Sequence, residues 1–291
     1  MAQISEIRPN ELVIDQRNMH TVMSPVIDGE TKKMGLIPRD FHAFPRGAHP
    51  GVTAVDFPLI DMSQWPDLIR DKESSKSRLS DIRLTGNGGS PIPALDQDGV
   101  GYCWAHSTTG VNMLLRAIAN LPYVPLSAFA VAATIKNGRD EGGWGAQSCD
   151  FIMQRGQPSQ AIWPQGDRNY SKYTNDQNCW VNAAQHKITE GWIDTAVPQY
   201  DRDLSRQQVG TLLLSGVPVV VDYNWWSHSV YALDLLDLDP SRGATDPMRY
   251  GIRIMNSWGD SWSDRGMGVL KGSQAWPDGA VAPRASTISY V

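Results

Sequence analysis

Four side chains of this 291-residue sequence have the chemistry that a thiol nucleophile and its helpers require. Cys103 offers the sulfur, His228 an imidazole that can take its proton, and Asn256 an amide that can hold the imidazole in orientation. Gln97 precedes the cysteine closely enough to donate a hydrogen bond to a developing oxyanion, together with the Cys103 backbone N–H. The sequence therefore predicts covalent catalysis by these four residues.

The elements that would position these side chains are visible in the hydrophobic pattern. Apolar residues recur with the helix period after Trp104, so a helix should begin close to Cys103, where unpaired backbone N–H groups favour a thiolate. His228 opens an apolar run at 228–238 and Asn256 ends another at 250–256, and both runs predict strands. If these strands pair, Asn256 can reach His228. We then expect a thiolate–imidazolium pair whose alkylation persists well below about pH 8.5.

The order of the elements indicates the fold class. Residues 1–55 carry several prolines and glycines without a sustained period, which predicts an extended arm. A second helical pattern follows the segment at 126–129, a third covers about 146–155, and a strand is predicted at 216–223. Helices in the first half and strands in the second are typical of an α+β protein.

Composition excludes several classes of protein. Lys and Arg total 26 against 31 Asp and Glu, and the net charge of −5 argues against nucleic-acid binding. No apolar run is long enough to span a membrane, and the N-terminus lacks the apolar core of a signal peptide. Three cysteines cannot all pair, which indicates a reducing compartment. We expect a cytoplasmic or virion-associated protein that no signal peptide exports.

Two motifs carry a resemblance to a known family. The segment from Gln97 to Ala105 (QDGVGYCWA) resembles the nucleophile region of the papain-like cysteine peptidases, and Asn256-Ser257-Trp258-Gly259 is identical to the asparagine motif of that family. Weaker matches extend over about 91–291. The resemblance implies a papain-like fold, with a helical subdomain at 56–195, an antiparallel β-barrel-like subdomain at 196–291 and the active-site cleft between them. It also implies a thiol endopeptidase with a polypeptide substrate and no cofactor.

The resemblance also implies substrate-binding residues. Glu141-Gly142-Gly143 resembles the family's substrate loop, in which Gly143 would pair with the peptide backbone. Trp226 and Ser229 flank His228 and would border the main side-chain pocket, which the Trp226 ring should restrict to small side chains. Trp258 would cover the His228–Asn256 hydrogen bond.

Some positions depart from the family pattern. Val100, Thr134 and Asp140 stand where the family has half-cystines, so its usual disulfides are missing. His106 and Tyr102 replace other residue types beside the thiol. Cys103 and His106 share a helix face, but no second ligand pair with metal spacing exists, and no metal site is predicted.

Alternatives to the peptidase hypothesis use the same fold. Residues 1–55 lack the long charged helix of the family's inhibitory propeptide, which favours a packing arm over an autoinhibitory segment. Pieces at 35–41 and 65–69 resemble papain-like proteins of bacteriophages, and the arm could then attach the chain to a virion. The alternative function is a structural or binding protein, such as a phage virion component, with weak or no peptidase activity. Acyl transfer to an amine is a third hypothesis.

Overall fold

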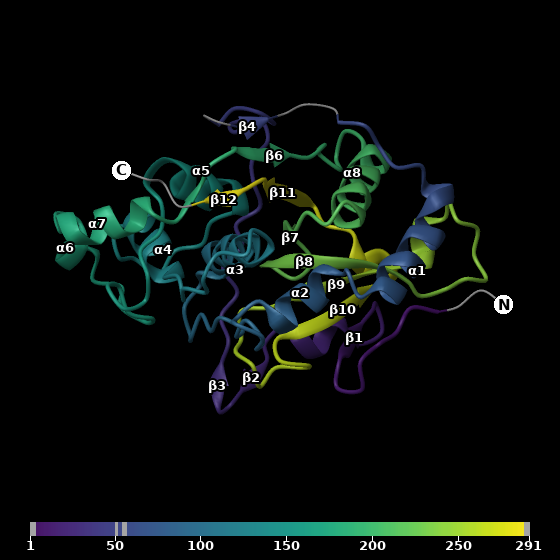
Figure 1. Cartoon of the computed structure of the whole chain (residues 1–291), viewed down its shortest axis with the longest axis horizontal. Coiled ribbons are helices and arrows are strands. Elements are labelled where there is room, and N and C mark those ends of the chain that lie inside the picture. The colour runs from purple at the N-terminus through teal and green to yellow at the C-terminus, as the bar shows by residue number, and fades with distance from the viewer. Residues whose placement is uncertain (1–3, 50–51, 54–56, 288–291) are drawn as a thin grey trace.

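The computed structural model describes residues 4–49, 52–53 and 57–287, so parts of the predicted arm and the last four residues lie outside the described chain. Two layers make up the molecule: a group of helices around α3 (Cys103–Ile118) and a long mixed sheet (Figure 1). The helix predicted to begin close to Cys103 therefore begins at that residue. In the described part of the chain no helix is both long and apolar enough to cross a membrane.

The helices of the first half surround α3, which is buried along almost its whole length. The Ser127 hydroxyl caps the next helix by accepting the Ala130 N–H at 3.2 Å, as expected for a serine at an N-cap. The helices of this group that follow α3 are α4 (Ala128–Lys136), α5 (Gly145–Arg155), α6 (Tyr170–Tyr173) and α7 (Gln177–Ala184). α4 and α5 pack directly on α3, and so fix the position of its N-terminus.

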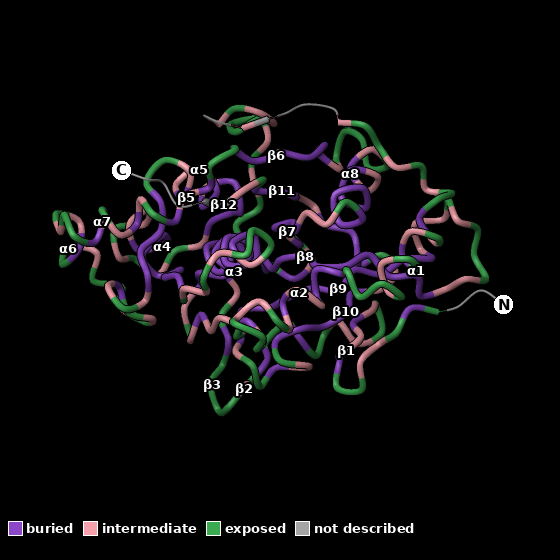
Figure 2. Tube along the Cα trace, viewed as in Figure 1, coloured by how far each residue is buried: buried purple, intermediate pink, exposed green. Residues whose placement is uncertain are grey.

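The sheet has eight strands in the order β1-β10-β9-β8-β7-β11-β6-β4. Its centre is antiparallel and buried on both sides (Figure 2), and the predicted strands are present at β7 (Val219–Tyr223), β8 (His228–Asp237) and β9 (Tyr250–Met255). The outer strands are β10 (Met267–Lys271), β11 (Gly279–Pro283) and β6 (Trp192–Asp194). Because β8 pairs with β9 as predicted, the residues that begin and end these strands come together.

Three more helices pack against the sheet, and one of them also contacts α3. α8 (Arg202–Leu214) begins at Asp201, whose carboxylate accepts the Leu204 N–H at 2.9 Å. α1 (Trp65–Ser75) packs against α8 and β8, and α2 (Leu79–Thr85) against α3 and β8. The subdomain ranges 56–195 and 196–291 stay a prediction, with α1 lying on the sheet side.

The N-terminal arm supplies both edges of the sheet. β1 (Leu12–Ile14) pairs in parallel with β10, and β4 (Val52–Thr53) pairs in parallel with β6 at the other edge. Two short hairpin strands, β2 (Val26–Ile27) and β3 (Glu30–Thr31), lie between them, while β5 (Lys187–Ile188) pairs with β12 (Ser286–Thr287) elsewhere. The arm therefore has to cross the molecule from one edge of the sheet to the other, and its path runs past the N-terminus of α3.

Candidate active site

Cys103 is the first residue of α3 and is fully buried. Burial raises the pKa of its thiol to about 12, and the backbone N–H groups of Ser229, Gly35 and Trp104 offset that effect only in part. Gly35 belongs to the arm and Ser229 follows His228 in β8. The sulfur therefore lies between the arm and the strand that begins with the predicted base.

His228 and Asn256 are joined as the sequence predicts. Nε2 of His228 lies 2.7 Å from Oδ1 of Asn256, which also accepts the Ser257 N–H at 2.8 Å. An amide oxygen only accepts, so Nε2 carries the hydrogen and Nδ1 has the free lone pair. Nδ1 makes no hydrogen bond to the described residues. This tautomer is the one in which the imidazole can act as a base through Nδ1.

Trp258 lies over this hydrogen bond as predicted. Its ring centroid is 4.9 Å from that of His228, with the two planes 30° apart, and both side chains are buried. Burial lowers the pKa of His228 to about 4, against the opposing effect of its hydrogen bond to Asn256. The imidazole is therefore neutral in this structure.

Gln97 has a fixed amide. Oε1 accepts the Ser257 hydroxyl at 2.7 Å, and Nε2 donates to the backbone oxygens of Val100 and Lys33, each at 2.7 Å. The Lys33 carbonyl comes from the arm. The amide predicted to stabilise an oxyanion is thus already bonded to a peptide carbonyl of the same chain.

The arm occupies the groove beside Cys103. The Leu36 N–H donates to the Ser227 carbonyl at 3.0 Å, and Leu36 and Gly143 form a parallel bridge in which the Ile37 N–H donates to the Gly143 oxygen at 2.9 Å. The Gly143 N–H donates in turn to the Gly35 carbonyl at 3.0 Å. Gly143, which was predicted to pair with a bound peptide, pairs here with the arm.

Close contact and charge hold this arm segment in place. A Cβ on Gly35 would lie 2.0 Å from the Gly101 backbone oxygen, so only glycine fits between the arm and the nucleophile loop. The Lys32 ammonium lies 2.8 Å from Asp96, and the Lys33 ammonium 2.6 Å from Asp140. The arm packs along both edges of the sheet, and it also covers the site.

Burial disfavours the predicted thiolate–imidazolium pair in this closed arrangement. Burial favours the neutral form of both groups, because it raises the pKa of Cys103 and lowers that of His228. The expectation of rapid alkylation below about pH 8.5 is therefore wrong for the closed chain. It applies only to a form in which the arm has left the groove and water reaches the sulfur.

Three of the predicted substrate-binding residues have different surroundings in the structure. A Cβ on Gly142 would lie 2.5 Å from the Gly35 oxygen, so Gly142 also faces the arm. Ser229 is buried, and its hydroxyl lies 2.9 Å from that of Ser107 in α3. Trp226 is buried too, its indole N–H donates to the Val22 carbonyl at 2.8 Å, and its ring lies 4.8 Å from His228. In this arrangement Trp226 does not narrow a side-chain pocket, because its ring packs inward under the arm.

Replacing Trp226 with alanine should destabilise the fold and leave the choice of side chain unchanged. Loss of a large buried aromatic ring costs about 3–5 kcal/mol of unfolding free energy. Urea unfolding measures this loss, and Tyr200→Ala, at a residue that is 66% exposed, is the matched control. A loss below about 1 kcal/mol, together with new acceptance of large side chains, would instead place Trp226 at the substrate.

His106 has a structural role and no metal partner among the described residues. It is buried, with Nδ1 2.8 Å from the Tyr102 carbonyl oxygen and its ring edge-on to Phe129. Burial lowers the pKa of His106 to about 4. The described chain does hold one group with metal-like spacing, the carboxylates of Glu30, Asp96 and Asp98, but the Lys32 ammonium already lies 2.6 Å from Glu30 and 2.8 Å from Asp96.

Comparisons with known proteins address the fold. No protein-family model matches the chain, and no curated protein matches it. Among solved structures, xylellain, a cysteine protease from Xylella fastidiosa, matches with a TM-score of 0.54 at 16% identity, over 88% of this chain and 97% of its own. The fold is papain-like. A likeness at this level of identity shows the fold alone.

Two further solved structures support this assignment of a papain-like fold. A recombinant stem bromelain precursor matches with a TM-score of 0.53 at 18% identity, over 83% of this chain and 77% of its own. The digestive procathepsin L2 proteinase of the Tenebrio molitor larval midgut matches with a TM-score of 0.51 at 16% identity, over 94% and 81%. The predicted α+β, papain-like fold class is confirmed.

Proposed function

We propose that this chain is a cysteine peptidase that hydrolyses peptide bonds through Cys103, His228, Asn256 and Gln97. The observation that carries the proposal is the 2.7 Å hydrogen bond from His228 to Asn256, which leaves Nδ1 as a free base in the strand next to the Cys103 helix. The papain-like fold of the chain and its structural neighbours, which include a cysteine protease, support the proposal.

The reaction follows from these groups. Nδ1 of His228 takes the Cys103 proton, and the sulfur attacks the carbonyl carbon of the peptide bond. The Gln97 amide and the Cys103 N–H stabilise the resulting oxyanion, and the imidazolium returns the proton to the leaving amine. Water activated by His228 then cleaves the thioester. Asn256 holds the imidazole throughout.

We further propose that the described state is closed, and that the arm must leave the groove before a substrate binds. The arm segment at 33–37 already uses the hydrogen-bonding groups of Gln97, Ser227 and Gly143. Its parallel bridge to Gly143 and its close approach to Gly101 leave no room for a second peptide. Two of the structural neighbours are described as a precursor and a pro-form.

The same experiments distinguish peptide hydrolysis from the two alternative functions. A papain-like structural or binding protein would retain the fold without turnover, and an acyl transferase would give an amide product from an added amine. No observation above supports a phage origin or a place in a virion, and both stay predictions from the sequence.

Substitutions at the site test the proposal with a thiol-directed peptidyl epoxide and peptide hydrolysis, in a chain whose arm is displaced by Gly35→Val. Cys103→Ala should abolish labelling and turnover. Asn256→Ala should reduce turnover about 10- to 150-fold, because a hydrogen bond to a charged imidazolium contributes about 1.5–3 kcal/mol. Asn178→Ala, at an exposed asparagine of α7, is the matched control. Labelling that persists in Cys103→Ala, or full turnover in Asn256→Ala, would contradict these roles.

A further inference from the structure

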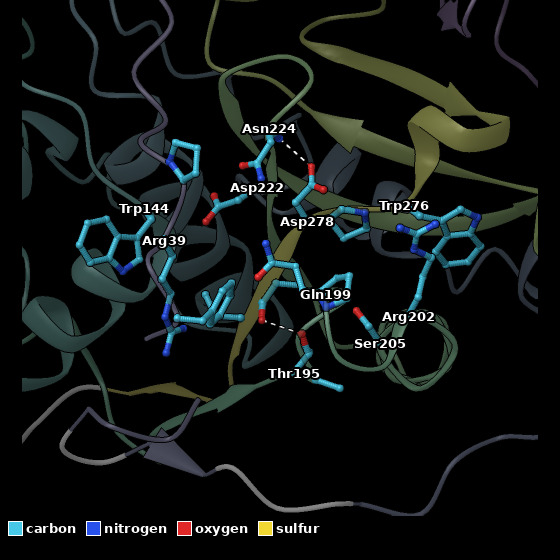
Figure 3. A pocket seen from close by; sticks show the side chains of 18 of the residues that line it. Arg39, Trp144, Thr195, Gln199, Arg202, Ser205, Asp222, Asn224, Trp276 and Asp278 are labelled. Carbon is cyan, nitrogen blue, oxygen red and sulfur yellow. Dashed lines mark hydrogen bonds between the residues drawn. The ribbon is translucent and has the colours of Figure 1, made fainter. Parts of the chain in front are cut away.

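A cavity of about 380 Å³ opens beside the arm, on the same side of the site as Gly143. The strands β7 and β11 form its floor, and Trp144 and Trp276 stand at opposite ends (Figure 3). Pro38, Arg39 and Phe41 of the arm also line it. The arm therefore covers the groove with residues 33–37 and lines this cavity with the residues that follow, and part of the cavity wall leaves when the arm leaves.

Acidic side chains concentrate in this cavity. Asp194 is buried at the end of β6, Asp222 lies in β7, and Asp278 precedes β11. Oδ2 of Asp222 accepts a hydrogen bond from the Gly145 N–H at 3.2 Å. Oδ1 of Asp222 is buried and has no hydrogen-bond partner among the described residues. Burial raises the pKa of Asp222 to about 6, and the Gly145 N–H, the nearby Ser229 hydroxyl and the Arg39 charge oppose that rise. The cavity wall therefore carries more negative charge than the other groups of the wall neutralise.

The arm places a cation on this wall. Arg39 follows the bridge residue Leu36 by three positions, and its guanidinium donates to both carboxylate oxygens of Asp194, at 3.0 and 2.9 Å. The side chains of this pair are 6% and 2% exposed. Arg39 also lowers the pKa of Asp222. One guanidinium therefore serves as counter-ion for two carboxylates.

The other cations of the cavity have different neighbours. Arg206 lies 3.4 Å from Asp203, and the charge of Arg202 acts on Asp278. Displacement of the arm would take the Arg39 guanidinium away from Asp194 and open this carboxylate to the cavity. A cation brought by a bound ligand would then restore the paired hydrogen bonds that Arg39 makes here.

We propose that the open cleft binds a polypeptide with a basic side chain in this cavity, with Asp194 and Asp222 as its counter-ions in place of Arg39. The inference rests on the proposed peptidase function and names its substrate class. Arginine should be preferred to lysine, because two parallel N–H bonds to Asp194 need a planar guanidinium. Trp144 adds an aromatic surface beside the charge.

Labelling rates at Cys103 test this specificity in the Gly35→Val chain. The probes are peptidyl epoxides that carry arginine, citrulline or alanine at each of the three positions before the reactive group. Citrulline has the length of arginine without its charge. At one position the arginine probe should label about 10- to 150-fold faster than the citrulline probe, the scale of hydrogen bonds to a charged group.

Two variants assign the preference to the cavity. Asp222→Asn and Asp194→Asn should each bring the arginine-to-citrulline ratio close to one, while the rate with the citrulline probe changes little. Asp203→Asn, at an exposed aspartate of α8, is the charge-matched control and should keep the ratio. If Asp194→Asn does not fold, Asp222→Asn alone decides the result.

The outcomes separate this inference from the proposed function. Equal labelling by all three probes at every position, with Cys103 still reactive, would overturn the basic specificity and leave the peptidase in place. An arginine preference that survives both substitutions would overturn the role of this cavity. Failure of every probe to label Cys103 would overturn the peptidase and, with it, the inference.

Discussion

Replacing Gly35 with valine should open the groove and raise peptidase activity. The valine Cβ would lie 2.0 Å from the Gly101 backbone oxygen, and neither backbone can yield without losing the hydrogen bonds between the arm and Gly143. Overpacking of this kind costs about 1–3 kcal/mol, which corresponds to about a 5- to 150-fold rise in the open fraction. Hydrolysis of a fluorogenic peptide at fixed protein concentration measures the change.

Two further variants make this result specific to the arm. Gly243→Val, in an exposed loop where no atom lies within 4 Å of the added Cβ, should leave activity unchanged. Lys33→Glu removes the 2.6 Å ion pair with Asp140 and places like charges together, so it should also raise activity, by less. Folded Gly35→Val and Lys33→Glu proteins with the activity of the parent chain would show that the arm does not close the site.

The positions of Cys103, His228 and Asn256 could be predicted because short-range patterns determine them. The helix period after Trp104 predicts where α3 begins, and the apolar runs at 228–238 and 250–256 predict two strands. Pairing of these neighbouring strands follows from their closeness in the sequence and brings His228 to Asn256. The chemistry that depends on these local elements was therefore accessible before the structure.

The path of the arm could not be predicted, because contacts distant in sequence determine it. Gly35 contacts Gly101, and the Lys33 carbonyl accepts a hydrogen bond from Gln97, which lies 64 positions later in the sequence. No local periodic pattern in the sequence indicates either contact. The only sequence feature there is a glycine between apolar residues and Pro38, which is common in loops. Arg39 and Asp194 are likewise 155 positions apart.

The orientation of Trp226 shows the same limit at a single residue. Because Trp226 flanks His228 in the sequence, the resemblance to the papain-like peptidases predicted that its ring borders the substrate pocket. The alternation of side chains along a strand is consistent with such a position. Trp226 precedes β8, however, and its ring points inward because its indole N–H donates to the Val22 carbonyl of the arm. A partner that is 204 positions away decided the direction of the ring.

Alkylation of Cys103 by iodoacetamide should be slow in the parent chain and fast in the Gly35→Val chain. In the closed state burial raises the pKa of Cys103 to about 12, so below pH 9 its thiolate fraction is far lower than that of an ordinary thiol. Because the pKa of the Cys103 thiol is raised, the unreactive protonated thiol persists as the pH increases to 9 and beyond. Exclusion of the reagent from the buried sulfur adds to this protection.

The open chain should reverse the effect, because the two causes of the high pKa disappear together. Water reaches the sulfur, and the Nδ1 lone pair of His228 can take its proton, so the alkylation midpoint should fall well below about pH 8.5. Peptide mapping reads Cys103 separately from Cys149 and Cys179, which are buried thiols with raised pKa in the same chain and should stay protected in both proteins. His228→Gln in the open chain should return the Cys103 midpoint toward that of a free thiol. A midpoint near 8.5 in the open chain that does not respond to His228→Gln would mean that no ion pair forms, and would favour a papain-like scaffold over a peptidase.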